Sequence, residues 1–319
     1  MLRSLLIYLS KASWAQRLVM GWGFAWKAAS RFIAGTRIED ALRVIRDLNA
    51  RGIKVTLDHL GEHTSTAEEA SEATLAITGT LGAIKKSGLC ANVSIKLTQI
   101  GLGLDERVCR QNLERILAKG KEFHNFVRVD MEDTPYTDQT IGLCRQMRRK
   151  GYRNVGIALQ SYLYRTEADA RKLLSDKTPI RLIKGAYQEP ASKAFPRKAD
   201  VDANFDLLTK LMMDAAKGMR SSKGSPDGCF PPIAAIGTHD EKRIVFATQY
   251  AEKIGLPTSA FEFQMLYGIR RDLQEKLQRE GYSVRVYVPF GTHWYPYYMR
   301  RLAERPANIW FFVSNFFRK

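Results

Sequence analysis

Short strand-like runs alternate with longer amphipathic segments after residue 36, and this alternation constrains the fold more than any other feature of the sequence. Each run is rich in aliphatic and β-branched residues, and each following segment repeats its apolar residues with helical spacing. The predicted strands cover residues 53–58, 92–97, 126–130, 155–160, 180–184, 233–238, 261–266 and 284–289. The predicted helices cover residues 38–51, 66–86, 105–123, 137–150, 166–174, 200–219, 241–254, 271–280 and 295–304.

Helices between consecutive strands indicate a parallel sheet, because a parallel neighbour requires a crossover connection. Eight strand–helix units over about 250 residues fit a closed, TIM-like (β/α)8 barrel of the α/β class better than an open doubly wound sheet. No Gly-x-Gly-x-x-Gly follows the first strand, which weakens a dinucleotide-binding fold. We expect an N-terminal helical arm at 1–36, a catalytic barrel at 37–305, a C-terminal amphipathic helix or tail at 306–319, and an exposed loop at 221–232.

The net charge of +17 is unusual and suggests a polyanionic partner. It is concentrated at the two ends: residues 1–35 carry five basic residues and no acidic one, and residues 270–319 carry ten basic and four acidic. We find no recognisable nucleic-acid-binding motif, so we do not expect a nucleic-acid partner. The basic ends are rich in aromatic residues, which favours peripheral contact with an anionic membrane. The alternative is that they pack on the barrel or on a partner subunit of a homo-oligomer.

The four cysteines contain no Cys-x-x-Cys, which argues against a disulfide framework or a zinc ribbon and favours a reducing, cytoplasmic location. The acid-free start is also similar to a transit peptide, although nothing else in the sequence supports an organelle. Histidines near strand ends are more often hydrogen-bonded than metal-bound, so we expect no metal site.

In a barrel of this kind the active site lies at the carboxyl ends of the strands. Nearly every predicted strand ends in a polar group, and together these groups predict a pocket for a charged ligand and a polar cofactor. The groups are Asp58, Glu62, Lys96, Asp130, Glu132, Gln160, Lys184, Thr238, His239, Gln264 and Tyr287. Any one of them alone is equally well explained as a solvated charge or a helix cap.

Three clusters are more specific. Arg181 and Lys184 lie on one apolar strand, and Gly185 after them allows a ligand to approach the backbone. Thr238 and His239 directly precede a helix, whose N-terminal amides bind phosphate, or else they simply cap it. The third cluster is the pair Arg300–Arg301, which suits a carboxylate through bidentate bonds or forms a solvated charged face.

These clusters, in their order and spacing, resemble the monofunctional bacterial proline dehydrogenases over about residues 37–310. The segments that carry the resemblance are Val55–Glu62, Ser94–Thr98, Val127–Asp133, Val155–Arg165, Arg181–Pro190, Thr238–Asp240, Phe261–Gly268, Tyr287–Pro289 and Trp294–Arg301. Gln188 stands where the longer, bifunctional members have Trp, which favours the short branch.

The resemblance implies a distorted (β/α)8 barrel that binds FAD noncovalently. It implies oxidation of L-proline to Δ1-pyrroline-5-carboxylate, with hydride transfer from C5 to flavin N5 and electrons passed to a membrane quinone. This is the first step of proline catabolism to glutamate. The location would be cytoplasmic, with peripheral contact at the inner face of the membrane.

The resemblance also implies roles for particular residues. Asp130, Arg181 and Tyr287 would be catalytic, with Arg181 at flavin N5. The proline site would use Lys96, Ala186, Tyr187, Leu266, Arg300 and Arg301. The cofactor would contact Met131, Gln160, Arg181, Lys184, Gly185, Ala186, Thr238, His239, Gln264 and Glu304. Glu62 and Arg301 would form a gating ion pair.

Two alternatives stay within the fold. A catalytically inactive barrel is disfavoured because the set of acids, lysines and arginines that the family uses is complete. An enzyme for hydroxyproline is the nearer alternative, because Tyr298 places an extra phenol beside the arginines.

Overall fold

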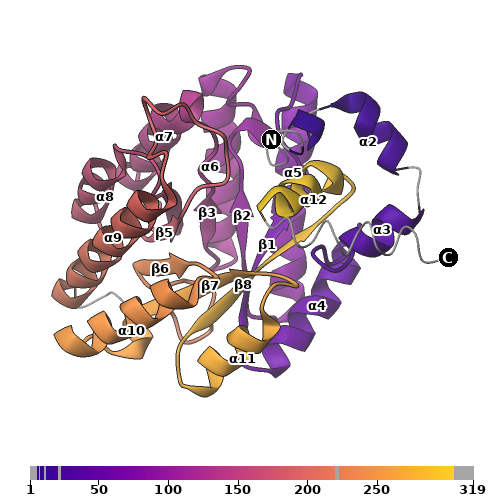
Figure 1. Ribbon diagram of the computed structural model, residues 1–319. Helices are drawn as coiled ribbons and strands as arrows, with labels where there is room; N and C mark the ends of the chain where they lie inside the picture. Colours follow the sequence, from indigo (N-terminus) through magenta and orange to yellow (C-terminus); the bar gives the residue numbers. More distant parts are fainter. Residues whose placement is uncertain (1–5, 7, 11, 21–22, 220–222, 305–319) are drawn as a thin grey trace.

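The computed structural model describes residues 6, 8–10, 12–20, 23–219 and 223–304. Its centre is a closed barrel in which each strand pairs in parallel with the next and β8 pairs with β1 (Figure 1). The strands are β1 Lys54–His59, β2 Ala91–Ile95, β3 Val127–Val129, β4 Val155–Gln160, β5 Ile180–Ile183, β6 Ala234–Gly237, β7 Phe261–Leu266 and β8 Val284–Phe290. The predicted barrel is confirmed, with strand ends displaced by one or two residues.

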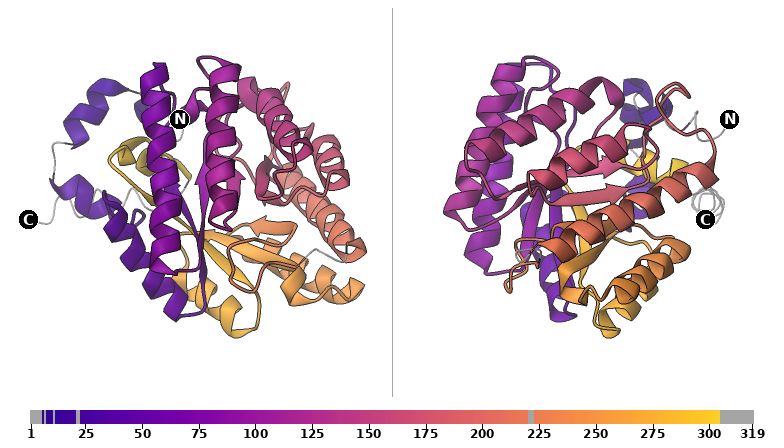
Figure 2. Two further views of the ribbon diagram at one scale, coloured as in Figure 1. Left: turned by 180° about the vertical axis from the view of Figure 1, so that it is seen from behind. Right: turned by 90° about the vertical axis from the view of Figure 1, so that its left-hand side faces the viewer.

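An outer ring of helices surrounds the strands (Figures 1 and 2). The ring helices are α4 Ile38–Ala50, α5 Ala67–Ser87, α6 Glu106–Glu122, α7 Thr137–Arg149, α8 Thr166–Ser175, α9 Lys198–Gly218, α10 Glu241–Ile254 and α11 Arg271–Arg279. Their apolar faces and the outward faces of the strands form one buried core. Burial of this surface is the main favourable term in folding such a barrel.

Local signals fix several helix ends. The side chain of Thr66 accepts a hydrogen bond from the Glu69 amide and caps α5, and Asp240 caps α10 in the same way from the Lys242 amide. Gly88 and Gly255 end these helices in the left-handed conformation, which glycine adopts without steric cost. These caps place the functional loops at reproducible positions.

The inside of the barrel is polar, whereas barrels of this type are usually filled by Val, Ile and Leu. Alternate positions along the strands point inward, and many of them carry charged or amide side chains. The buried polar residues at these positions are Thr56, Asp58, Asn92, Ser94, Arg128, Arg181, Glu262, Gln264 and Arg285. Such a filling is stable only where the groups are hydrogen-bonded to one another.

A second apolar core joins the N-terminal arm to the last helix. The arm contains α2 Ser13–Met20 and α3 Gly23–Ala29, and α12 Trp294–Glu304 follows β8. Seen from behind in Figure 2, the indigo arm lies beside the yellow α12. The arm therefore packs on α12, as one of the alternatives for the basic ends anticipated. The predicted tail 306–319 lies outside the described residues.

Loop 223–232 closes the amino end of the barrel, and the expectation that it is exposed was wrong in part. Gly228 is buried, and its carbonyl oxygen accepts a hydrogen bond from Arg285 at 2.8 Å. The Asn92 amide donates to the carbonyl oxygen of Cys229 at 2.9 Å. Turn-forming residues predict the loop correctly but carry no information about what covers it.

All four cysteines are free thiols. Within the described ranges, every helix is too short or too polar to cross a bilayer.

Candidate active site

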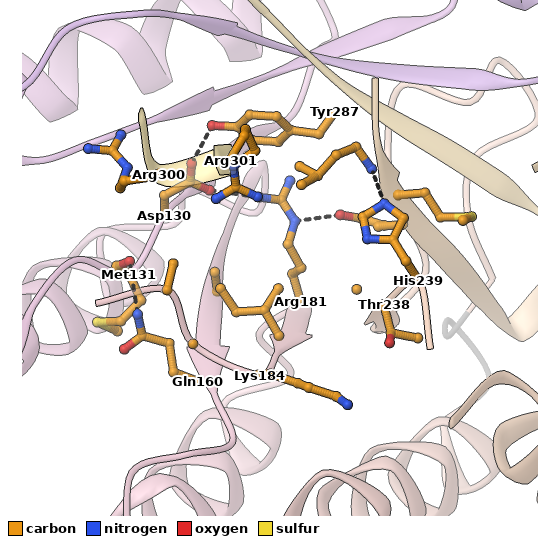
Figure 3. A pocket seen from close by; sticks show the side chains of 18 of the residues that line it. Asp130, Met131, Gln160, Arg181, Lys184, Thr238, His239, Tyr287, Arg300 and Arg301 are labelled. Carbon is orange, nitrogen blue, oxygen red and sulfur yellow. Dashed lines mark hydrogen bonds and ion pairs between the residues drawn. The ribbon is translucent and has the colours of Figure 1, made fainter. Parts of the chain in front are cut away.

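The carboxyl ends of the strands open into a cavity of about 570 Å³ (Figure 3). It is lined by Lys96, Asp130, Met131, Ala158, Gln160, Arg181, Ile183, Lys184, Gly185, Ala186, Tyr187, Lys198, Gly237, Thr238, His239, Asp240, Gln264, Met265, Leu266, Ile269, Tyr287, Tyr297, Arg300 and Arg301. Every residue to which the resemblance gives a role lies on this lining except Glu62 and Glu304, and of the other strand-end groups Asp58 and Glu132 lie outside it. Residues far apart in the chain therefore meet in one place.

Asp130 is the centre of a hydrogen-bonded network on the cavity wall. Its Oδ1 accepts from Arg181 Nη1 at 2.7 Å and from Ser94 Oγ at 2.6 Å. Its Oδ2 accepts from the Tyr287 hydroxyl at 2.8 Å. The Arg181 guanidinium also lies 5.3 Å from the centre of the Tyr287 ring. The three residues predicted to be catalytic thus hold one another in place.

Lys96 and Tyr287 converge on a second buried carboxylate, Asp58. Asp58 Oδ2 accepts from Lys96 Nζ at 3.0 Å and from the Tyr287 hydroxyl at 2.6 Å. Burial alone would lower the pKa of Lys96, but the attraction of Asp58 and Asp130 outweighs it and raises the pKa, so the ammonium stays charged. Burial beside the two carboxylates raises the pKa of Tyr287 well above 10.0, which keeps its hydroxyl protonated.

Helix α12 crosses the mouth of the barrel, where it contributes Tyr297, Arg300 and Arg301 to the cavity lining. Arg300 makes a bidentate ion pair with Glu62 in the β1–α5 loop, with Nη1 at 2.9 Å from Oε2. This corrects the predicted pair of Glu62 with Arg301. Adjacent residues on a helix point about 100° apart, so only one of the two guanidinium groups faces this loop.

The Glu62–Arg300 pair is mostly buried, with side chains 19% and 13% exposed, and each partner stabilises the charged form of the other. Burial would raise the pKa of Glu62, but Arg300 and Lys96 lower it below its usual value. Burial would lower the pKa of Arg300, but Glu62 raises it. The guanidinium of Arg301 lies 5.2 Å from the centre of the Tyr297 ring.

Lys184 follows the end of β5 and turns away from Arg181, toward the start of α9 and α10. Its ammonium contacts Asp202 at 2.5 Å and Asp240 at 2.6 Å. Gly185 has φ of +121°, and a Cβ there would lie 2.5 Å from the Tyr162 ring. Only glycine fits this backbone conformation and this space, so the chain at Gly185 packs closely against the Tyr162 ring.

Thr238 and His239 line the cavity and also organise the start of α10. The Asp240 amide donates to Thr238 Oγ1 at 3.0 Å. The Leu266 amide donates to His239 Nε2 at 2.9 Å, so this nitrogen carries no proton and Nδ1 is the protonated one. The segment Thr238–His239 therefore both stabilises the start of α10 and lines the cavity.

Two polar atoms of the cavity wall are buried without a protein partner: Arg181 Nη2 and Gln160 Oε1. The other end of the Gln160 amide donates to the Met131 carbonyl oxygen at 3.4 Å. An unsatisfied buried donor or acceptor costs about 1–3 kcal/mol, so such atoms commonly face a ligand. A donor and an acceptor on one wall fit a flat, polar, heterocyclic group.

Glu304 ends α12, and its side chain is outside the part that the structure describes. Within the described part of the chain, no three metal-binding side chains cluster together. Tyr298 is buried in the second core against Trp294 and Phe32, turned away from the cavity that Tyr297 lines. The sequence argument for hydroxyproline therefore loses its support.

Several residues of the site were not assigned from the sequence. Asp202, Asp240 and Tyr297 make contacts between distant segments, for which the sequence gives no signal, whereas Ser94 stands two residues before the assigned Lys96 on one predicted strand. Glu262 and Arg285 were also missed, although a signal exists: each stands two residues before an assigned residue on the same strand, Gln264 or Tyr287. Residues two apart on a strand share a face.

The closed barrel has a cavity at the carboxyl ends of its strands, where enzymes of this fold have their active sites, and several cationic side chains line it. A profile of the family described as proline dehydrogenase matches residues 41–313. The chain is 38% identical to "Proline dehydrogenase 1" of Bacillus subtilis (strain 168), over 100% of both chains. The chain belongs to the proline dehydrogenase family and is an oxidoreductase.

Two further comparisons agree. A proline dehydrogenase of Deinococcus radiodurans is 40% identical over 293 residues, which is 91% of this chain and 90% of the relative. The solved structure of proline utilization A (PutA) from Bdellovibrio bacteriovorus has a TM-score of 0.78 and 25% identity. The match covers 88% of this chain and 33% of PutA. The resemblance to the monofunctional branch is confirmed by the full-length matches.

Proposed function

We propose that the protein oxidises L-proline to Δ1-pyrroline-5-carboxylate with noncovalently bound FAD, the first step of proline catabolism to glutamate. A hydride leaves C5 and a proton leaves the ring nitrogen, so that a C5–N double bond forms. The bound FAD would supply the hydride acceptor at its N5, and a quinone would then take the two electrons. One observation supports the proposal: the residues that the resemblance assigns to substrate and cofactor, Glu304 apart, line a single cavity.

The substrate carboxylate would bind to Lys96, Arg300 and Arg301 on the cavity lining. Charge-assisted, bidentate bonds from arginine fix the direction of a carboxylate as well as its position. Ala186, Tyr187, Leu266 and Tyr287 would enclose the ring. Desolvation of this pocket strengthens each interaction, since the charges act in a low dielectric.

The residues present fit a flavin. Arg181 Nη2 and Gln160 Oε1 offer an unpartnered donor and acceptor, and Gly185 lies with them on the cavity lining. A cation at Arg181 would stabilise negative charge on the reduced flavin. The remaining contacts would come from Met131, Lys184, Ala186, Thr238, His239, Gln264 and Glu304.

Asp130 and Tyr287 would act by position. Asp130 holds the Arg181 guanidinium, and the Tyr287 hydroxyl, kept protonated, donates to the carboxylates. The amine of the substrate must be in its neutral form for its lone pair to assist loss of the hydride, so turnover should rise with pH.

Glu62 and Arg300 would gate the site. Their ion pair ties α12 to the β1–α5 loop across the mouth of the barrel. A closed pair would exclude water from the cavity, and its opening would admit the substrate.

The electron acceptor would be a membrane quinone, reached by peripheral contact at the inner face of the cell membrane. The free thiols fit the reducing cytoplasm. Tyr8, Trp14 and Leu18 are exposed on the basic N-terminal arm, as a surface that enters a headgroup region would be.

The direct test is anaerobic bleaching of the flavin. Protein purified with FAD should be yellow, and its absorption band should bleach on addition of L-proline. Hydroxyproline, added to a parallel sample, should bleach it more slowly. Protein that cannot take up FAD, or a yellow protein that L-proline leaves unbleached, would refute the proposal.

A further inference from the structure

Beneath the cavity, the barrel encloses an ion pair that the family comparison assigns no role. Glu262 on β7 and Arg285 on β8 are both fully buried. Arg285 Nε lies 2.8 Å from Glu262 Oε1, and its Nη2 lies 3.3 Å from Oε2. The remaining donors of Arg285 reach the carbonyl oxygens of Val55 at 3.0 Å and Gly228 at 2.8 Å. The pair is thus anchored to the amino end of the barrel.

From Glu262 a chain of hydrogen bonds runs upward to the cavity. The Gln264 amide nitrogen donates to Glu262 Oε1, and Arg181 Nε donates to Gln264 Oε1. Arg181 Nη1 continues the chain to Asp130. Glu262, Gln264 and Arg181 are buried, and the Asp130 side chain is 13% exposed at the cavity, so the bonds below the cavity act without competition from solvent.

The chemistry of Glu262 fixes the direction of this chain. Burial alone would raise the pKa of Glu262, but Arg285 lowers it, so the carboxylate is ionised and can only accept hydrogen bonds. Gln264 must therefore turn its NH2 group toward Glu262. Its carbonyl oxygen then faces Arg181 Nε, which needs an acceptor.

With Nε and Nη1 both held, the planar guanidinium of Arg181 has one orientation. Its third nitrogen, Nη2, is the buried donor without a protein partner. Arg181 lines the cavity, so the orientation of its guanidinium decides the direction in which the Nη2 hydrogens point at the cavity wall.

We propose that Glu262, charged and held by Arg285, is a positioning residue that orients Arg181 through the amide of Gln264. The inference rests on the proposed function for the identity of the group at Arg181, which is the flavin, but the orientation itself belongs to the protein. If the ion pair were only structural, its replacement by apolar residues would leave kcat unchanged. Buried pairs can often be replaced in this way without loss of stability.

The first test is Glu262→Gln. The neutral amide both donates and accepts, so the Gln264 amide is free to turn and Arg181 loses its fixed acceptor. A crystal structure of E262Q should show the Arg181–Asp130 contact, 2.7 Å in the parent, lengthened beyond hydrogen-bond distance. In the FAD-loaded enzyme kcat should fall at least about tenfold, since small misplacements of positioning groups are costly. The KM for proline should change less, and the flavin reduction potential should fall.

A double-mutant cycle separates positioning from stability. In the Gln264→Met background, E262Q should cause no further loss of kcat, because the intermediary amide is already gone. If E262Q does not fold, the pair E262L/R285M removes both charges together, and it should show the same loss of kcat. Arg148→Met is the matched control: Arg148 is a buried arginine that bonds to backbone carbonyl oxygens, outside this chain. It should lower stability and leave kcat unchanged.

Three results would overturn the proposal: an unmoved Arg181 in the E262Q structure, an unchanged kcat and potential in folded E262Q or E262L/R285M, or full additivity with Q264M. These are distinguishable from failure of the proposed function. A protein that takes up no FAD refutes the flavin, whereas the position of Arg181 in the variant structure still decides the role of Glu262.

Discussion

At the scale of single residues, the two arginines of α12 differ in what they contact. Arg300 is bound to Glu62, whereas Arg301 lies against Tyr297 on the cavity lining. Removing Arg300 therefore also leaves the Glu62 carboxylate without its partner, so an Arg300 variant tests the ion pair and substrate binding together.

Arg301→Met should raise the KM for L-proline about tenfold or more with a smaller change in kcat, because a hydrogen bond to a charged group contributes about 1.5–3 kcal/mol. Steady-state kinetics measure this. Arg43→Met, at an exposed arginine of α4, is the control and should behave as the parent. An unchanged KM in R301M would show that Arg301 does not hold the carboxylate.

Glu132 is a second residue with a measurable signature. It is buried beside Thr98, whose amide donates to it at 3.1 Å. Burial raises its pKa from 4.5 to about 7 despite the hydrogen bonds from Thr98. The folded state thus holds a proton that the unfolded chain releases, so this group favours folding below pH 4.5 and its contribution is lost as the pH rises toward about 7.

Glu132→Gln should remove this dependence. Between pH 5 and pH 8 the parent should lose about 2 kcal/mol more free energy of unfolding than E132Q does. Urea unfolding at both pH values measures the difference, with the exposed Glu122→Gln as control. Parallel pH profiles for parent and E132Q would contradict the assignment.

At the scale of elements, the sequence predicts the barrel well because its strands and helices follow local rules. The run at residues 155–160 is apolar and β-branched, and it forms β4 over the same residues. Arg181 and Lys184 stand three residues apart, so a continuous strand would point them to opposite faces, but β5 ends at Ile183, before Lys184. The cavity was predicted because strand ends in a barrel meet.

What the sequence could not predict depends on contacts between elements. The partner of Glu62 depends on how α12 is rotated, and two adjacent arginines look alike in sequence. The burial of Tyr298 depends on the arm packing against α12. Glu262 and Arg285 share a strand face with Gln264 and Tyr287, but this spacing does not say that the two residues pair with each other.

The Glu62–Arg300 pair joins α12 to the β1–α5 loop, so loss of the pair should let α12 open more often. In Glu62→Ala, amide hydrogen exchange in α12 should become about tenfold faster or more, because the helix loses a buried, charge-assisted contact at the mouth. Exchange in the β7–β8 pair should be unchanged. Asp47→Ala, which removes an exposed ion pair with Arg51, is the control. Unaltered exchange in α12 would mean that the pair does not hold the gate.

At the scale of the whole molecule, charge and exposed apolar residues coincide on the N-terminal arm. Residues 1–35 carry five basic residues and no acidic one. Trp14 and Leu18, exposed and four residues apart on α2, lie on one side of that helix. Ala15 on α2 and Ala25 on α3 are buried in the second core with α12. The arm thus has an inner face that packs on the rest of the protein and an outer, exposed face that does not.

The outer face predicts binding to an anionic bilayer, where a quinone resides. The protein should co-sediment at low salt with vesicles that contain phosphatidylglycerol, and it should do so less with neutral vesicles, since basic residues near the surface add to apolar insertion. The double variant W14E/L18E should bind at least about tenfold more weakly, because two apolar side chains no longer enter the interface. Leu75→Glu, at an equally exposed leucine of α5, is the matched control and should bind as the parent. Failure of the parent to bind, or equal binding by W14E/L18E, would show that the arm does not bring the active site to the membrane.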